Sequence, residues 1–200
     1  MMVPYRIGAF LLVCWFSFAL TGCARSPQVT FYTLAPVAQA GVGSAPPSFT
    51  TAVAPVTLPE YVDRPQLVLN TAGSRVNVLD MHRWAEPLKN AIPRLLADNI
   101  SRLLGTDRVS SYPQSASNDA DYRVTADFLH FESSGDSVML EALWNIRPPG
   151  DGPRKIRRFK ISEPFREDNN EARVAAYSRA LASLSRDIAD SLREESSKPR

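Results

Sequence analysis

Two histidines, His82 and His130, are the only side chains in this 200-residue sequence whose ordinary pKa suits proton transfer near neutral pH. They belong to different predicted elements, and His82 with Glu86 does not form the HExxH pattern of zinc proteases. The carboxylate pair Glu167–Asp168 stands at a predicted helix start, where the helix dipole accounts for it. The sequence has no GxSxG elbow, glycine-rich phosphate loop or dinucleotide fingerprint. We therefore predict no catalytic residue, metal site or cofactor, and a protein that is not an enzyme.

Cys23 is the residue for which the sequence predicts a covalent role. Arg6 is followed by the apolar run IGAFLLVCWFSFAL at 7–20, the layout of an export signal. As a helix this run is about 21 Å long, which is short of the roughly 30 Å hydrocarbon core, so cleavage is favoured over a permanent span. The tetrapeptide LTGC at 20–23 resembles the lipobox of bacterial lipoproteins, in which the cysteine thiol accepts a diacylglycerol as a thioether. An ordinary secretory signal with an incidental cysteine is the alternative.

With cleavage before Cys23, we predict that the chain has four parts. These are a cleaved signal at 1–22, a lipidated N-terminus and short tether at 23–28, a single domain at 29–196 and a tail at 197–200. Cys14 leaves with the signal and Cys23 carries lipid, so the mature chain has no thiol for a disulfide or a metal. Removal of Arg6 with the signal changes the net charge from +2 to +1, and a nearly neutral domain does not favour nucleic acid as a partner.

Hydrophobic periodicity predicts the elements of the domain. Runs at 122–131, 138–146 and 154–161 form an antiparallel meander, with a hairpin loop at 132–136. Further strands are predicted at 29–34, 49–57, 66–70, 75–79 and 108–112, with a loop or flexible link at 35–48. Amphipathic helices are predicted at 84–104, kinked or split by Pro93 and capped by Gly105, and at 167–195. The fold class is α+β, an antiparallel or mixed sheet with a strand meander covered by two amphipathic helices.

Three segments carry a resemblance to a known family: FYTL at 31–34, LPEYVDRPQ at 58–66 and RWAEPL at 83–88. Their order and spacing resemble the PqiC/YmbA family of ABC-transporter auxiliary lipoproteins over essentially the whole mature chain. The resemblance implies a non-enzymatic, homo-oligomeric lipoprotein lipidated at Cys23. It also implies a transport partner with an MCE domain, which carries lipids between the inner and outer membranes. The lipoprotein would tether or receive the far end of that periplasmic conduit.

The location of the anchor follows from a second resemblance. Ala24 rather than Asp follows the lipidated cysteine, and by similarity to lipoproteins with the usual sorting signal this favours the periplasmic face of the outer membrane over the inner membrane.

The family match marks six residues without giving their roles: Tyr61, Asp63, Arg64, Pro65, Trp84 and Glu86. Prolines stiffen the segment 58–65, which could dock a partner through Tyr61, Asp63 and Arg64. In the alternative, Tyr61 packs beneath the segment, while Asp63 and Arg64 pair or cap backbone locally. We expect Trp84 to anchor a helix onto the sheet.

The run RKIRRFK at 154–160 contains five basic residues in seven. As a strand it places cations on both faces, which suits a sheet edge that resists unwanted pairing. Alternatively, Arg157 and Arg158 meet anionic headgroups or an acidic partner surface.

Two functions remain after the enzyme classes are set aside. The first is an outer-membrane-anchored lipoprotein subunit of an MCE-type lipid transport system, which supports envelope integrity. The alternative is a stand-alone periplasmic carrier lipoprotein that binds lipid between its helices and sheet. A carrier requires an apolar cavity of roughly 300 to 1,000 Å³.

Overall fold

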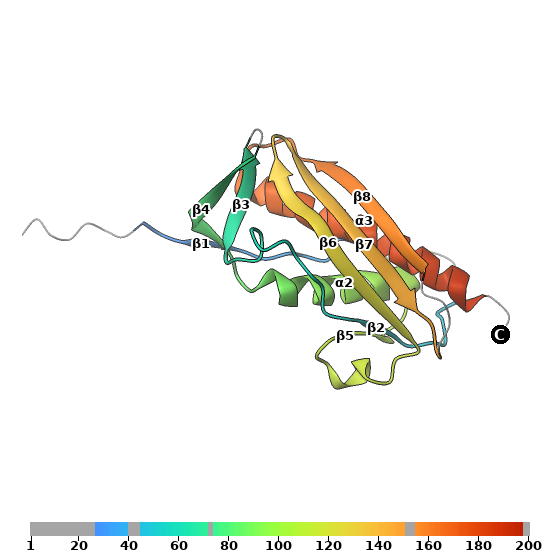
Figure 1. Ribbon diagram of the computed structural model, residues 1–200. Coiled ribbons are helices and arrows are strands. Elements are labelled where there is room, and N and C mark those ends of the chain that lie inside the picture. The colour runs from blue at the N-terminus through green and yellow to red at the C-terminus, as the bar shows by residue number, and fades with distance from the viewer. Residues whose placement is uncertain (1–26, 40–44, 72–73, 151–154, 198–200) are drawn as a thin grey trace, which may run out of the picture.

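A three-strand meander lies at the centre of the fold. The computed structural model describes residues 27–39, 45–71, 74–150 and 155–197, so the predicted signal at 1–22 and the lipidation site Cys23 lie outside the described residues. Strands β6 (Tyr122–Ser134), β7 (Ser137–Arg147) and β8 (Lys155–Pro164) pair antiparallel in chain order, as predicted (Figure 1). The predicted hairpin loop at 132–136 is wrong in extent, because pairing continues to Ser134 and Ser137 and leaves a two-residue turn. Gly135 has a φ of 58° in that turn, a conformation that glycine adopts without strain.

Strand β6 also joins the meander to two smaller groups of strands. Its first residues pair in parallel with β2 (Thr51–Val53), beyond which lies β5 (Val109–Ser111), and a short 3₁₀ helix (Ser115–Ser117) follows. Its last residues pair in parallel with β3 (Gln66–Thr71). Strands β4 (Arg75–Trp84) and β1 (Thr30–Tyr32) continue the sheet beyond β3. The eight strands therefore form one mixed sheet, which confirms the α+β class.

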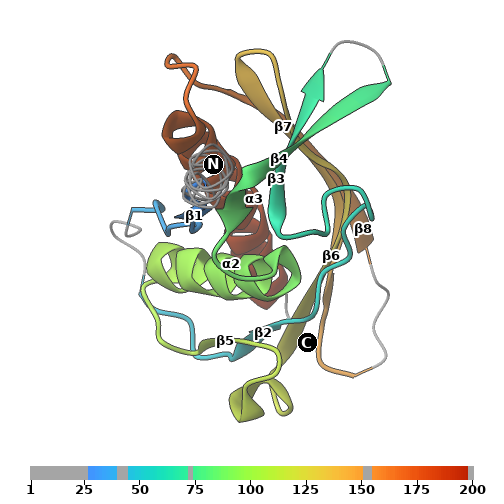
Figure 2. The same cartoon turned by 90° about the vertical axis from the view of Figure 1, so that its left-hand side faces the viewer.

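Two helices, α2 (Leu88–Leu104) and α3 (Asn170–Ser196), cover one face of this sheet (Figure 2). Helix α3 packs on β7 and β8, α2 packs on β2 and β5, and the helices contact each other. The predicted apolar stripes are confirmed, since their members are all buried: Leu88, Ile92, Leu95, Leu96, Ile100, Leu103 and Leu104 on α2, and Val174, Tyr177, Leu181, Leu184, Ile188 and Leu192 on α3. Neither helix combines the length and apolarity that a membrane span requires.

The predicted boundaries of α2 need correction. The helix begins at Leu88 rather than Trp84, because β4 continues to Trp84, where Tyr32 pairs with it. Pro93 does not split the helix, which runs unbroken to Leu104. A proline here removes one backbone hydrogen bond, while burial of its ring among the core side chains offsets part of that cost. Gly105 ends the helix in the left-handed region, with a φ of 65°, as predicted.

The N-terminal segment is fastened to the domain at several points. Strand β1 pairs in parallel with the last residues of β4. Beyond it, the Ala35 N–H donates to Ser178 Oγ on α3 at 3.2 Å, and the Ala38 N–H donates to Asn99 Oδ1 on α2 at 3.2 Å. The described part of the predicted flexible link at 35–48 is therefore bonded to both helices at its start.

Strand β8 lies at an edge of the sheet, as its basic residues predict, and within the described ranges it pairs only with β7. On the outer face, Arg158 donates hydrogen bonds to Glu141 of β7, and Lys160 Nζ lies 3.5 Å from the same carboxylate. Glu141 is only 5% exposed, and these two cations, with Arg158 contributing most, lower its pKa. On the other face, Arg157 pairs with Glu194 at 3.3 Å and lies over the ring of Trp144. The three described cations of the run, Arg157, Arg158 and Lys160, thus face two carboxylates of the domain.

Helix α3 depends on its N-terminal cap, which gives a first prediction. Asn169 Oδ1 accepts a hydrogen bond of 2.7 Å from the Ala172 N–H. Asn169→Ala should lower the free energy of unfolding by about 1 kcal/mol, because that N–H loses its partner. Thermal unfolding should show a decrease of about 2–4 °C in Tm. Asn90→Ala, at an exposed position within α2, is the matched control and should not lower Tm. An equal decrease in Tm for the two variants would contradict the capping role.

Glu141 gives a second prediction, on the dependence of stability on pH. Because its pKa in the folded state is below the ordinary value of 4.5, its contribution is present above that pH and is lost as the pH falls through the lower value. Glu141→Gln should therefore lower Tm at pH 7, and the difference from the unmodified protein should shrink below about pH 4.5. Glu60→Gln, at an exposed side chain, is the control. A deficit that persists unchanged at low pH would rule out the charge as its cause.

Candidate functional site

The motif segments 58–65 and 84–88, which are distant in sequence, meet at one end of the β3–β4 pair. Strand β3 begins where β4 ends, and the Trp84 N–H donates to the Pro65 carbonyl at 2.7 Å. Between the segments is a hollow of about 420 Å³, here called the motif hollow, lined by Asp63, Arg64, Pro65, Trp84, Ala85, Glu86, Pro87 and Leu88. Of the six residues that the family resemblance marks, only Tyr61 is not part of this lining.

The segment 58–65 is ordered by its own backbone. The N–H groups of Val62 and Asp63 both donate to the Pro59 carbonyl, at 3.0 and 3.2 Å, which closes a tight turn. The Val62 side chain is buried beneath the turn. Just before the segment, Thr57 forms a bridge to Asp127 on β6. The segment is therefore a fixed protrusion, as its two prolines suggest.

Tyr61 points away from the motif hollow and binds a buried carboxylate. Its hydroxyl donates to Glu132 Oε2 on β6 at 2.6 Å. Asn70 donates to the other carboxylate oxygen at 3.3 Å, and His130 Nδ1 lies 3.4 Å from it. Burial, together with the adjacent Glu132, raises the pKa of Tyr61, so the hydroxyl keeps its proton. Tyr61 is thus half-buried and bonded within the domain.

Ion pairs flank the motif hollow on two sides. Asp63 pairs with Lys89 of α2 at 2.6 Å, and Glu86 accepts a hydrogen bond from Arg94 of the same helix. Arg64 differs from these, because its guanidinium is exposed and makes no ion pair with any residue that the structure describes. The hollow therefore presents one uncompensated positive charge beside an apolar surface.

The base of the motif hollow is fixed by aromatic packing. Trp84 is 7% exposed, and its ring meets that of Tyr177 on α3 edge to face, with centroids 5.6 Å apart. Tyr177 also contacts Phe131 of β6 at 4.7 Å. Trp84 thus anchors the end of β4 to helix α3, close to its expected role.

The two cations that pair with the motif carboxylates were not predicted from the sequence. These are Lys89 and Arg94, although both follow the RWAEPL motif within the first two turns of α2.

The geometry of the motif hollow suits binding rather than bond cleavage. Trp84, Pro65, Pro87 and Leu88 supply apolar surface, and a few charges stand around it, the usual composition of a recognition site. Within the described ranges, no group of three or more His, Cys, Asp or Glu side chains is placed to hold a metal ion.

The two histidines lie in separate surroundings. His82 Nδ1 is 2.9 Å from the Tyr32 hydroxyl, whereas His130 adjoins Glu132. The structure therefore brings neither histidine to the motif hollow.

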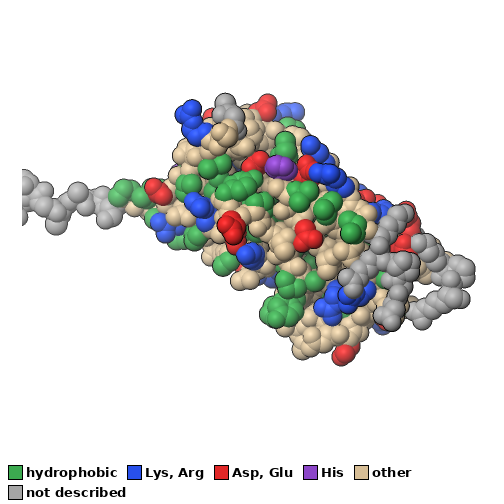
Figure 3. All heavy atoms as spheres, viewed as in Figure 1, with side chains coloured by type: hydrophobic (Ala, Val, Ile, Leu, Met, Phe, Trp, Pro, Cys, Tyr) green, Lys and Arg blue, Asp and Glu red, His purple; other side chains and the backbone are tan. Residues whose placement is uncertain are grey.

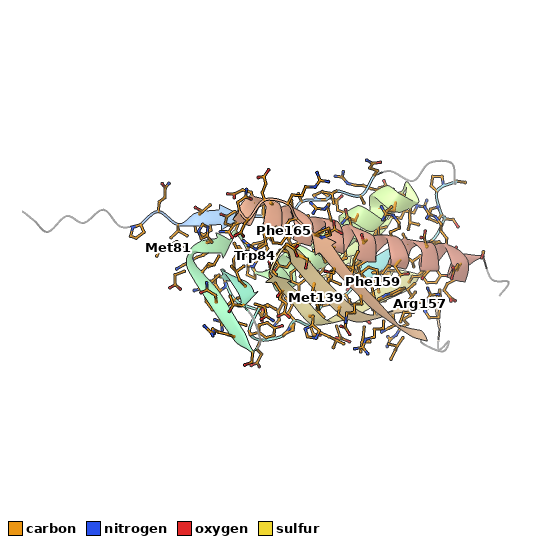
Figure 4. All side chains as sticks on the ribbon, turned by 90° about the horizontal axis from the view of Figure 1, so that it is seen from above. Met81, Trp84, Met139, Arg157, Phe159 and Phe165 are labelled. Carbon is orange, nitrogen blue, oxygen red and sulfur yellow. The ribbon has the colours of Figure 1, made fainter. Side chains whose placement is uncertain are left out.

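Arg157 and Arg158 are not part of this site. Arg157 and Met81, both labelled in Figure 4, lie toward opposite ends of the molecule, and Met81 lies on β4, the strand that ends at the motif hollow. The predicted contact residues therefore form two separate groups: Asp63 and Arg64 beside the motif hollow, and Arg157 and Arg158 on β8.

Comparison with solved structures places the fold among known ones. An uncharacterised protein has a TM-score of 0.69 and 19% identity, over 83% of this chain and 99% of that chain. A protein from Xanthomonas campestris, of the family DUF330, has a TM-score of 0.71 and 16% identity, over 85% of this chain and 100% of that chain. A PelC dodecamer from Paraburkholderia phytofirmans is more distant, with a TM-score of 0.43 and 10% identity over 78% of this chain and 94% of that chain.

Comparison at the level of sequence families identifies the chain itself. No curated protein matches the sequence significantly. The family described as ABC-type transport auxiliary lipoprotein component matches residues 32–189, which is most of the chain and includes both segments of the motif hollow. The resemblance that the three motifs indicate is thereby confirmed, and the chain belongs to the family of ABC-type transport auxiliary lipoprotein components.

Proposed function

We propose that this protein is anchored by lipid on Cys23 at the periplasmic face of the outer membrane, where it docks the conduit of an MCE-type lipid transport system. Membership of a family of transport auxiliary lipoproteins supports the general role. The complete LTGC lipobox supports the anchor, and Ala24 supports the outer membrane. The role is non-enzymatic: the protein holds a transport partner at a membrane and thereby supports envelope integrity.

The observation that carries the docking role is the convergence of the motif residues. Five of them line one hollow, although they come from segments on either side of the β3–β4 hairpin. Residues that served only to stabilise the core would not need to surround an open, partly apolar space. The MCE-domain partner inserts an apolar side chain against Pro65 and Pro87 and places a carboxylate opposite Arg64.

Self-association involves the other end of the molecule in this proposal. Arg157 and Arg158 lie on the edge strand β8, and Figure 4 places Arg157 far from the end at which Met81 lies. The neighbouring Ile156 is 68% exposed. We assign this edge to contact between copies of the chain rather than to headgroups of the anchoring membrane, because the short tether keeps the opposite end near that membrane.

The stand-alone carrier is the weaker candidate. A carrier needs space for an acyl chain between the helices and the sheet. That space is occupied by large side chains that are almost completely buried, among them Trp144, Phe131, Leu96 and Ile188. Such a filled core argues against a carrier and for a docking protein.

The anchor can be tested with Cys23→Ser. Without its thiol the chain cannot receive the diacylglycerol, so the variant should fold and lose its membrane location. Fractionation of cell envelopes should move the protein from the outer-membrane fraction to the soluble periplasmic fraction. The unmodified protein, expressed at the same level, is the control. Retention of the variant in the outer membrane, or full envelope function at native abundance, would contradict the tethering role.

Docking through the motif hollow can be tested with Arg64→Glu. Reversal of this charge places like charges in contact and should weaken binding by roughly tenfold or more. The measurement is recovery of the MCE-domain partner with the detergent-solubilised lipoprotein. Arg186→Glu, an equal change at an exposed position on α3, is the control and should leave recovery unchanged. Equal recovery with both variants would exclude the motif hollow, and no recovery with the unmodified protein would exclude the partner.

A further inference from the structure

The end of the molecule at which the chain enters carries exposed apolar side chains. Phe31 on β1 is 63% exposed, and Met81 on β4 is 38% exposed. Figure 3 shows hydrophobic side chains at this end, and Figure 4 places Met81 there. Single exposed hydrophobic residues are common, but a largely exposed phenylalanine beside a second apolar residue forms a small patch.

Pairing of the two strands holds this patch in a fixed position. Phe31 is the register partner of Arg83, so both side chains project from the same face of the sheet. Met81 lies two residues before Arg83 on the same strand, in the stretch where β4 bulges relative to β3. The Arg83 side chain is itself held, because its Nε donates to the Asp80 carbonyl at 3.1 Å. The patch is thus part of the folded sheet.

Covalent geometry limits how far this patch can lie from the anchor. Phe31 follows Cys23 by eight residues, a span of at most about 29 Å when fully extended. The rest of the domain extends away from β1 (Figure 1). The β1–β4 end is therefore the part of the folded domain that the tether holds nearest to a membrane. Arg157, on β8, lies toward the opposite end (Figure 4).

We propose that Phe31 and Met81 insert into the lipid surface that holds the anchor and thereby set the orientation of the domain on the membrane. The inference rests on the proposed anchoring at Cys23. An aromatic ring and a thioether chain suit the boundary between headgroups and acyl chains. The charges nearby are of both signs, Arg83 and Asp80, so apolar contact rather than charge selects the occupant. The motif hollow, at the other side of β4, is then held at a fixed height above the membrane.

The test uses the full-length, processed lipoprotein reconstituted in vesicles of phosphatidylethanolamine and phosphatidylglycerol. Because Cys14 is removed and Cys23 is blocked by lipid, a single new cysteine can be labelled with a polarity-sensitive fluorophore. Phe31→Cys and Met81→Cys report the patch, and Leu129→Cys, at an apolar residue of β6 that is 37% exposed, is the matched control. Flotation of the vesicles reports anchoring independently.

Emission from labels at positions 31 and 81 should shift to shorter wavelength on reconstitution and should be quenched by nitroxide-labelled lipid, whereas the label at 129 should show neither change. If the protein floats but its labels at 31 and 81 behave like the control, this inference is wrong and the proposed anchoring is unaffected. A wavelength shift without lipid quenching would mean that protein covers the patch, and would also overturn it. If the protein fails to float, the anchor is absent, and both the proposed function and this inference are wrong.

Discussion

The contact between Trp84 and Tyr177 determines how the parts of this fold fit together. Tyr177 is almost completely buried on α3 and touches both Trp84 and Phe131, so one ring joins β4, β6 and the helix. Loss of that ring would open a cavity among three elements, the costliest kind of change in a packed core. Because Trp84 ends β4 and bonds to Pro65, the position of the motif hollow depends on the same contact.

Much of the fold could be predicted because burial leaves a periodic pattern in the sequence. The meander and both apolar stripes follow from spacings of two, three and four. The errors occur where distant residues override local pattern. Glu132 suggests a turn by its polarity, yet it is a strand residue whose buried carboxylate is bonded to Tyr61. Trp84 fits the helical spacing, yet β1 and the Pro65 carbonyl keep it in the sheet. The parallel pairings of β6 with β2 and β3 leave no local signal at all.

The candidate site shows the same division between local and distant information. The motifs name the residues, but only the fold brings 58–65 against 84–88. Of the two alternatives posed for this segment, local packing describes two of the three side chains. Tyr61 bonds inward to Glu132, and Asp63 is neutralised by Lys89 from the helix. Of these three side chains, only Arg64 is exposed and has no ion pair with a described residue, a distinction that the sequence of the segment does not convey.

The parallel pairing of β1 with β4 has a mechanical consequence. A pull on the chain before residue 30 acts along the axis of β1, so it loads the hydrogen bonds to β4 together, in shear, instead of opening them one at a time. Farther along, the bonds from Ala35 to Ser178 and from Ala38 to Asn99 pass the remaining load to both helices. A strand of only three residues can therefore act as a fastening, since force applied at the N-terminus is distributed over the sheet and the helical layer at once.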